Sequence, residues 1–99
     1  MFSRENIGGR LRLIRLAHCR LMCVPDPTQR EFARLCALKP TAWNAAERGR
    51  RRIGIESAVK LWESTGATLA YIYLDEPGAL PTELRREIRK IKKADQASA

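Results

Sequence analysis

The sequence predicts an all-α fold with five helices and an extra C-terminal helix. Apolar residues recur three and four positions apart, as at Ile7, Leu11 and Ile14, which is the period of a helix with one buried side. Residues that typically start and end helices separate these stripes. No segment alternates apolar and polar residues with the period of two that half-buried strands show. The 99 residues are a usual length for one folding unit.

The first three expected helices have clear boundary signals. The stripe of residues 7–18 must end before Pro25-Asp26-Pro27, because proline cannot continue a helix. A second helix starts at Thr28-Gln29-Arg30-Glu31, which has the form of a capping box: the hydroxyl and the carboxylate each accept a backbone N–H. Pro40 suits the first position of a third helix, and Gly49 suits the position just after its end.

Three further helices are expected in the second half. Gly66 ends a fourth helix, and Thr68 caps a fifth helix over residues 69–74. Pro81 opens a last helix, beyond which residues 95–99 should fray. The fourth helix should bury one stripe, which consists of Ile55, Ala58, Val59 and Trp62. We also expect both tryptophans, Trp43 and Trp62, in the core. The last helix has an apolar stripe that suits packing, within or between chains, better than direct DNA binding: Leu84, Ile88 and Ile91.

The charge is strongly basic and unevenly distributed. There are 19 Lys and Arg residues against 11 Asp and Glu residues, a net charge of +8. Residues 1–53 have a net charge of +8, residues 54–81 of −3 and residues 82–99 of +3. We divide the chain into a domain of residues 1–80 and a basic C-terminal helix and tail of residues 81–99. A small basic protein of this kind often binds a polyanion.

Several classes of protein are disfavoured by the composition. The only histidine is His18, and the HExxH, GxSxG and glycine-rich phosphate-loop motifs are absent, so we expect no enzyme and no cofactor. Cys19, Cys23 and Cys36 do not form a disulfide framework, nor, with His18, the paired ligands of a zinc site. We expect Cys36 in the core and the other two cysteines on the surface. The lack of a long apolar run or secretory signal indicates a cytoplasmic protein.

The most informative segment is residues 29–48, where two short helices and a turn form a helix-turn-helix pattern. Its expected inward side chains are Phe32, Ala33, Cys36, Leu38, Trp43 and Ala46. The side chains then left outward or on the flank of the second helix are small, polar or basic: Lys39, Thr41, Ala42, Asn44, Ala45 and Arg48. Such a face suits a helix that enters the DNA major groove, where bulky residues would block the approach.

These segments resemble the lambda-repressor-like helix-turn-helix family of phage and bacterial transcriptional regulators, also called the XRE family. The similar segments span roughly residues 7–74: Ile7-Gly8-Gly9-Arg10-Leu11-Arg12, Thr28-Gln29-Arg30-Glu31-Phe32-Ala33, Glu47-Arg48-Gly49, the region of Leu61, and Gly66-Ala67-Thr68-Leu69-Ala70-Tyr71-Ile72. The resemblance implies a five-helix lambda-repressor-like domain that binds double-stranded DNA sequence-specifically. Two features depart from the family: Ala37 at a turn position that is usually glycine, which costs about 1 kcal/mol, and the long connection Cys19–Pro27.

The resemblance also implies site residues. Base contacts are expected from Lys39, Thr41, Ala42, Asn44, Ala45 and Arg48, and asparagine is suited to bidentate bonding with adenine. Phosphate contacts are expected from Gln29, Arg30, Arg50, Arg51 and Arg52. The simpler alternative for each of these residues is a solvated surface position.

The resemblance implies a transcriptional regulator, in particular a repressor of the phage or mobile-element type, associated with the bacterial nucleoid. Operators are usually bound by two-fold dimers, so we expect a homodimer on DNA. Its apolar contact residues are expected in the C-terminal third: Tyr71, Tyr73, Leu74, Leu84, Ile88 and Ile91. Two alternatives remain: an antitoxin that regulates its own operon and binds a toxin, and a protein-interaction adaptor on the same fold.

Overall fold

The structure, a computed structural model, describes residues 3–25 and 27–98. Within these residues it contains six α-helices, one short 3₁₀-helix and no strand, so the predicted all-α class is confirmed. The elements are α1 (Arg4–Leu21), α2 (Gln29–Leu35), α3 (Pro40–Glu47), α4 (Ile55–Thr65), α5 (Leu69–Leu74), η1 (Pro77–Ala79) and α6 (Thr82–Ser98).

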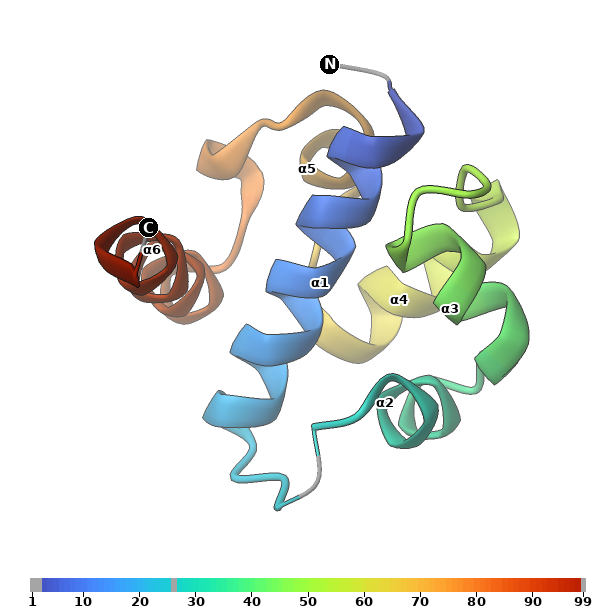
Figure 1. The fold of residues 1–99 in the computed structure, drawn as a ribbon, viewed down its shortest axis with the longest axis horizontal. Coiled ribbons are helices and arrows are strands. Elements are labelled where there is room, and N and C mark those ends of the chain that lie inside the picture. Colours follow the sequence, from blue (N-terminus) through green and yellow to red (C-terminus); the bar gives the residue numbers. More distant parts are fainter. Residues whose placement is uncertain (1–2, 26, 99) are drawn as a thin grey trace.

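The long helix α1 runs through the middle of the molecule, between α6 on one side and α3 on the other (Figure 1). Its stripe of Ile7, Leu11 and Ile14 is completely buried, as predicted. The position of α5 also depends on α1, because the buried Arg10 donates hydrogen bonds to the carbonyl oxygens of Ile72 (3.0 Å) and Tyr73 (3.3 Å). These bonds place a cation at the C-terminal end of α5, where helix carbonyls lack partners.

The hydroxyl caps predicted at two helix starts are confirmed, whereas the Glu31 carboxylate, expected to accept a backbone N–H, lies 3.8 Å from Arg34. The hydroxyl of Thr28 accepts the N–H of Glu31 (3.3 Å), and that of Thr68 accepts the N–H of Tyr71 (3.2 Å). The first helix starts earlier than its apolar stripe indicates, because Ser3 provides a cap of the same kind. Three side-chain oxygens thus define three helix starts.

The turn between α2 and α3 is built around Ala37, which has the left-handed φ of 58° expected there. The N–H of Leu38 reaches back to the carbonyl of Ala33 (2.8 Å), which closes the end of α2. Alanine in this conformation is strained, and the burial of Leu38 beneath the turn offsets that cost.

A close approach of α1 to the C-terminal end of α3 requires glycine at position 8. A Cβ atom on Gly8 would lie 2.6 Å from the carbonyl oxygen of Glu47 and 2.9 Å from that of Ala46. Both atoms belong to backbone, which cannot move aside as a flexible side chain can. Gly8 therefore allows α3 to lie directly against α1.

Two predicted burial assignments are wrong. The inward stripe of α4 is formed by Ala58 and Leu61 at its centre, whereas Ile55 is 59% exposed and Trp62 is 46% exposed. Of the expected stripe only Ala58 is fully buried, so the buried side of α4 is rotated around the helix from that stripe. Cys19 was expected on the surface, but it is buried on α1.

The last helix, α6, shares the core of the rest of the chain. Leu84, Ile88 and Ile91 are buried, and α6 lies along α1. The expected fraying of residues 95–99 is wrong for residues 95–98, because α6 continues to Ser98 and Asp95 accepts a hydrogen bond from Arg12 (3.0 Å). The end of that expected range, residue 99, lies outside the described residues.

We predict that the substitution Ile88→Ala lowers the free energy of unfolding by about 2–5 kcal/mol, because it leaves a cavity between α6 and α1. The control is Lys92→Ala, at an exposed position of the same helix, which should change stability by less than about 0.5 kcal/mol. Urea unfolding followed by circular dichroism measures both values. Equal stability of the two variants would contradict the shared core.

Candidate nucleic-acid interface

Helices α2 and α3 pack through an aromatic contact at their crossing. The rings of Phe32 and Trp43 have centroids 5.1 Å apart and are tilted by 49°. Every residue expected to face inward is buried: Phe32, Ala33, Cys36, Leu38, Trp43 and Ala46. Because the apolar side of α3 is used in this contact, its opposite side faces solvent.

The residues predicted to contact bases do lie on or beside this outward side of α3. Asn44 and Ala45 are half-buried, and the others are exposed: Lys39, Thr41, Ala42 and Arg48. They do not form one continuous site, however. Thr41 and Asn44 line a shallow groove with Gln29 and Arg30 of α2, whereas Lys39 and Ala42 line a separate hollow between α3 and the start of α4.

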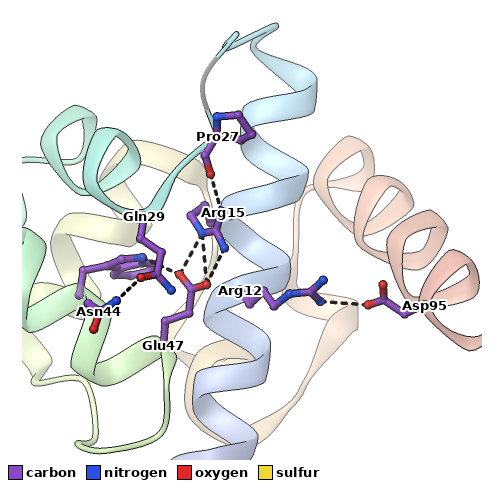
Figure 2. A network of polar contacts seen from close by, with 8 residues as sticks. Arg12, Arg15, Pro27, Gln29, Asn44, Glu47 and Asp95 are labelled. Atoms are coloured by element: carbon purple, nitrogen blue, oxygen red, sulfur yellow. Dashed lines mark hydrogen bonds and ion pairs between the residues drawn. The ribbon is translucent and has the colours of Figure 1, made fainter. Parts of the chain in front are cut away.

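The groove contains a side-chain contact that the sequence analysis did not anticipate. The Asn44 amide donates a hydrogen bond to the side-chain oxygen of Gln29 (Figure 2). An asparagine amide has two N–H donors and one acceptor oxygen, so one donor and the oxygen of Asn44 remain for a ligand. Gln29 was expected to contact phosphate; here it fixes the orientation of Asn44.

A buried ion pair joins α1 to the end of α3. Arg15 donates from Nη2 to Glu47 Oε1 (2.7 Å) and from Nε to Oε2 (3.0 Å), a two-pronged contact seen in Figure 2. The Trp43 indole N–H also donates to Oε2 of Glu47 (2.7 Å). The side chain of Glu47 is only 3% exposed, and that of Arg15 is 12% exposed. The carboxylate thus accepts donors from two elements of the fold.

The sequence contained one signal for this ion pair. Glu47 is the last residue of α3, where the negative end of the helix dipole disfavours a carboxylate. An acidic residue at such a position, two residues before the glycine that ends the helix, Gly49, indicates that a cation lies nearby. The sequence alone could not identify that cation as Arg15, because 32 residues separate the two partners.

Arg15 also anchors the long connection Cys19–Pro27. Its Nη1 donates to the carbonyl oxygen of Pro27, just before α2. The connection begins with residues that extend α1 to Leu21, and the N–H of Val24 returns to the carbonyl of Cys19 (2.9 Å). One guanidinium therefore contacts both α3 and the segment that leads into α2.

The arginine loop, defined as Arg50–Arg52, lies beyond the end of α3 and is exposed. Arg4 at the start of α1 donates to the carbonyl oxygen of Arg50 (3.2 Å), which fixes the loop against the domain. Arg51 and Arg52 line the hollow beside α3 together with Lys39 and Lys60. The loop therefore adds cations next to the outward side of α3.

Most of the predicted dimer contacts are buried inside the chain, which corrects that part of the site. Tyr71, Leu84, Ile88 and Ile91 belong to the core, so this fold does not present them to a partner. The remaining two residues differ. Tyr73 is half-buried and its hydroxyl donates to the carbonyl of Ile53 (2.7 Å), while Leu74 is 39% exposed.

Metal-binding clusters and membrane-spanning helices are absent from the described residues. No group of three His, Cys, Asp or Glu side chains within residues 3–25 and 27–98 is arranged to hold a metal ion. No helix in these ranges is long and apolar enough to cross a membrane. Comparisons with protein-family models, with curated proteins and with solved structures give no match.

We predict that Glu47→Gln lowers the free energy of unfolding by about 3 kcal/mol, because it leaves the nearly buried Arg15 without a carboxylate. The matched control is Glu63→Gln, the same chemical change at an exposed position of α4, with an expected effect below about 0.5 kcal/mol. Both are measured by urea unfolding at pH 7. A loss below 0.5 kcal/mol for Glu47→Gln would show that the ion pair does not hold α3.

Proposed function

We propose that this protein is a sequence-specific DNA-binding regulator of transcription with a lambda-repressor-like helix-turn-helix domain. The observation that carries the proposal is the groove between α2 and α3, where Gln29 holds the Asn44 amide beside Thr41. An oriented amide on the outward side of a helix is suited to read adenine, which offers one donor and one acceptor in the major groove.

The surroundings of Asn44 support DNA as the ligand. Ala42 and Ala45 are small, so α3 can approach base edges closely. Arg30 lies on one side of α3, and the arginine loop lies beyond its end. These cations suit phosphates on both sides of the groove that receives α3. In this proposal Asn44 and Thr41 read bases, and Arg30 with the loop fixes the register of the protein on the duplex.

The proposal includes a second copy of the chain on the same operator. The acidic segment of residues 54–81 does not suit contact with phosphates, yet α4 exposes Ile55 and Trp62 there. With Val59, these residues occupy one side of α4 at positions i, i+4 and i+7. Exposed apolar residues grouped in this way favour a protein partner; we assign them to the homodimer in place of the buried residues of α5 and α6.

A toxin-binding antitoxin is the second candidate function, and the same apolar side of α4 favours it. Such a protein would use α3 for its own operator and α4 for the toxin. A repressor of the phage or mobile-element type requires only a second copy at α4. Stoichiometry on DNA in the absence of other proteins separates the two functions.

The base-reading role of Asn44 can be tested on duplexes selected from a randomised pool. Asn44→Ala should weaken binding to the selected sequence about tenfold to a hundredfold and leave binding to random duplex unchanged. Gln29→Ala should show the same selective loss to a smaller degree, because Gln29 orients the amide. The control is Asn6→Ala, at an exposed position of α1. Equal losses on both duplexes, measured by fluorescence anisotropy, would refute base reading.

The contact between copies predicts a different phenotype for Trp62→Gln. We expect this variant to bind a single half-site like the unaltered protein, and to lose cooperative binding to two half-sites about one helical turn apart. Glu63→Gln on the same helix is the matched control. Titration and analytical ultracentrifugation give affinity and stoichiometry. Retained cooperativity in Trp62→Gln would exclude the α4 contact.

A further inference from the structure

Helix α6 separates its charges between two sides. Two of its three acidic residues pair with arginines of α1: Glu87 lies 3.6 Å from Arg20, and Asp95 lies 3.0 Å from Arg12. Lys90 also pairs with Glu87 (3.5 Å). The ion pairs that hold α6 therefore consume acidic residues of α6 and leave its cations on the opposite side.

Three of these cations form what we call the α6 stripe: Arg86, Arg89 and Lys93. They lie at positions i, i+3 and i+7, so they share one side of the helix. All three side chains are exposed, and within the described residues none of these side chains forms a hydrogen bond or an ion pair. Arg85 and Lys92 extend the positive surface along one flank, where they line a groove toward η1.

The stripe fits a ligand with closely repeated negative charges. Like charges three and four residues apart destabilise a helix, and among the described residues no ion pair involves any of these three side chains. The stripe spans about 10 Å at 1.5 Å per residue. A DNA duplex carries one negative charge per roughly 1.7 Å of its axis, so several phosphates can face the stripe at once.

The stripe is turned away from the proposed site on α3. Helix α1 lies between α6 and α3 in Figure 1, and in Figure 2 Arg12 extends toward α6 while Arg15 extends toward α3. The stripe is on the side of α6 opposite Leu84 and Ile88, which contact the core. A duplex bound at α3 therefore leaves the stripe free.

We propose that the α6 stripe binds the phosphate backbone of a second DNA duplex, so that one chain joins two duplexes. A backbone ligand is favoured over a protein because, among the described residues, the large exposed apolar side chains all lie outside α6: Met22, Leu35, Ile55, Trp62 and Leu74. Protein interfaces contain an apolar centre, which the stripe lacks. The proposal rests on the proposed function only for the first duplex, because the stripe contacts phosphates of any sequence.

The test is a capture assay with two duplexes. A selected duplex is attached to beads, and retention of a second, fluorescent duplex of random sequence is measured with the full chain. The triple variant Arg86→Gln, Arg89→Gln, Lys93→Gln should capture at least about tenfold less of the second duplex. The slope of the logarithm of the capture affinity against the logarithm of the salt concentration should also become shallower by nearly three, because each lost phosphate contact contributes about 0.9. Its binding to the first duplex alone should change less than about threefold.

Two single variants provide a matched control. Arg89→Gln and Lys90→Gln each remove one cation from α6, but the Lys90 ammonium is paired with Glu87 (3.5 Å), whereas the Arg89 side chain forms no ion pair among the described residues. Arg89→Gln should reduce capture more than Lys90→Gln does. Circular dichroism and thermal unfolding confirm that each variant is folded before its capture is compared.

Three results would overturn the proposal. Unchanged capture by the triple variant would show that a dimer joins duplexes through its two α3 helices, or that the stripe serves another partner. Equal losses for Arg89→Gln and Lys90→Gln, or equal losses of capture and of first-duplex binding, would indicate only general charge attraction. A failure of the base-reading role of Asn44 would give a different result. Asn44→Ala would then bind the selected and the random duplex as the unaltered protein does, while the triple variant would still lose capture of the second duplex.

Discussion

The placement of α3 depends on the buried ion pair between Arg15 and Glu47. A carboxylate at the C-terminal end of a helix, almost without solvent, requires a cation and donors around it. Arg15 supplies two donors and Trp43 a third. Gly8 permits the close approach of the two helices that these bonds need. Because Arg15 also contacts Pro27, the same guanidinium relates α1 to α3 and to the entrance of α2.

The position of α3 against α1 determines which polar side chains α3 exposes. Trp43 is held inward by its ring contact with Phe32 and by its bond to Glu47. Asn44, the next residue, is therefore directed along the groove, where Gln29 accepts one of its N–H groups. The interior thus determines which polar atoms are presented outside, although no atom of the ion pair lies in the groove.

Local chemistry explains which parts of the fold could be predicted. The caps at Thr28 and Thr68 and the left-handed Ala37 involve residues a few positions apart, so the sequence contains their complete signal. The exposure of Trp62 and the continuation of α6 through Asp95 to Ser98 could not be predicted, because they depend on which distant element covers each surface. The same holds for the site: the outward residues of α3 follow from helical period, whereas the Gln29–Asn44 bond depends on the angle between two helices.

The separation of α1 and α6 along the chain has a consequence for folding kinetics. Arg12 and Asp95 are 83 residues apart, whereas α2 and α3 are joined by a short turn. Closing a long loop costs more chain entropy, and contacts between distant residues slow folding. We therefore expect the α2–α3 pair to assemble early and the docking of α6 to come last. In that order α6 determines how long the apolar side of α1 stays accessible to water during folding.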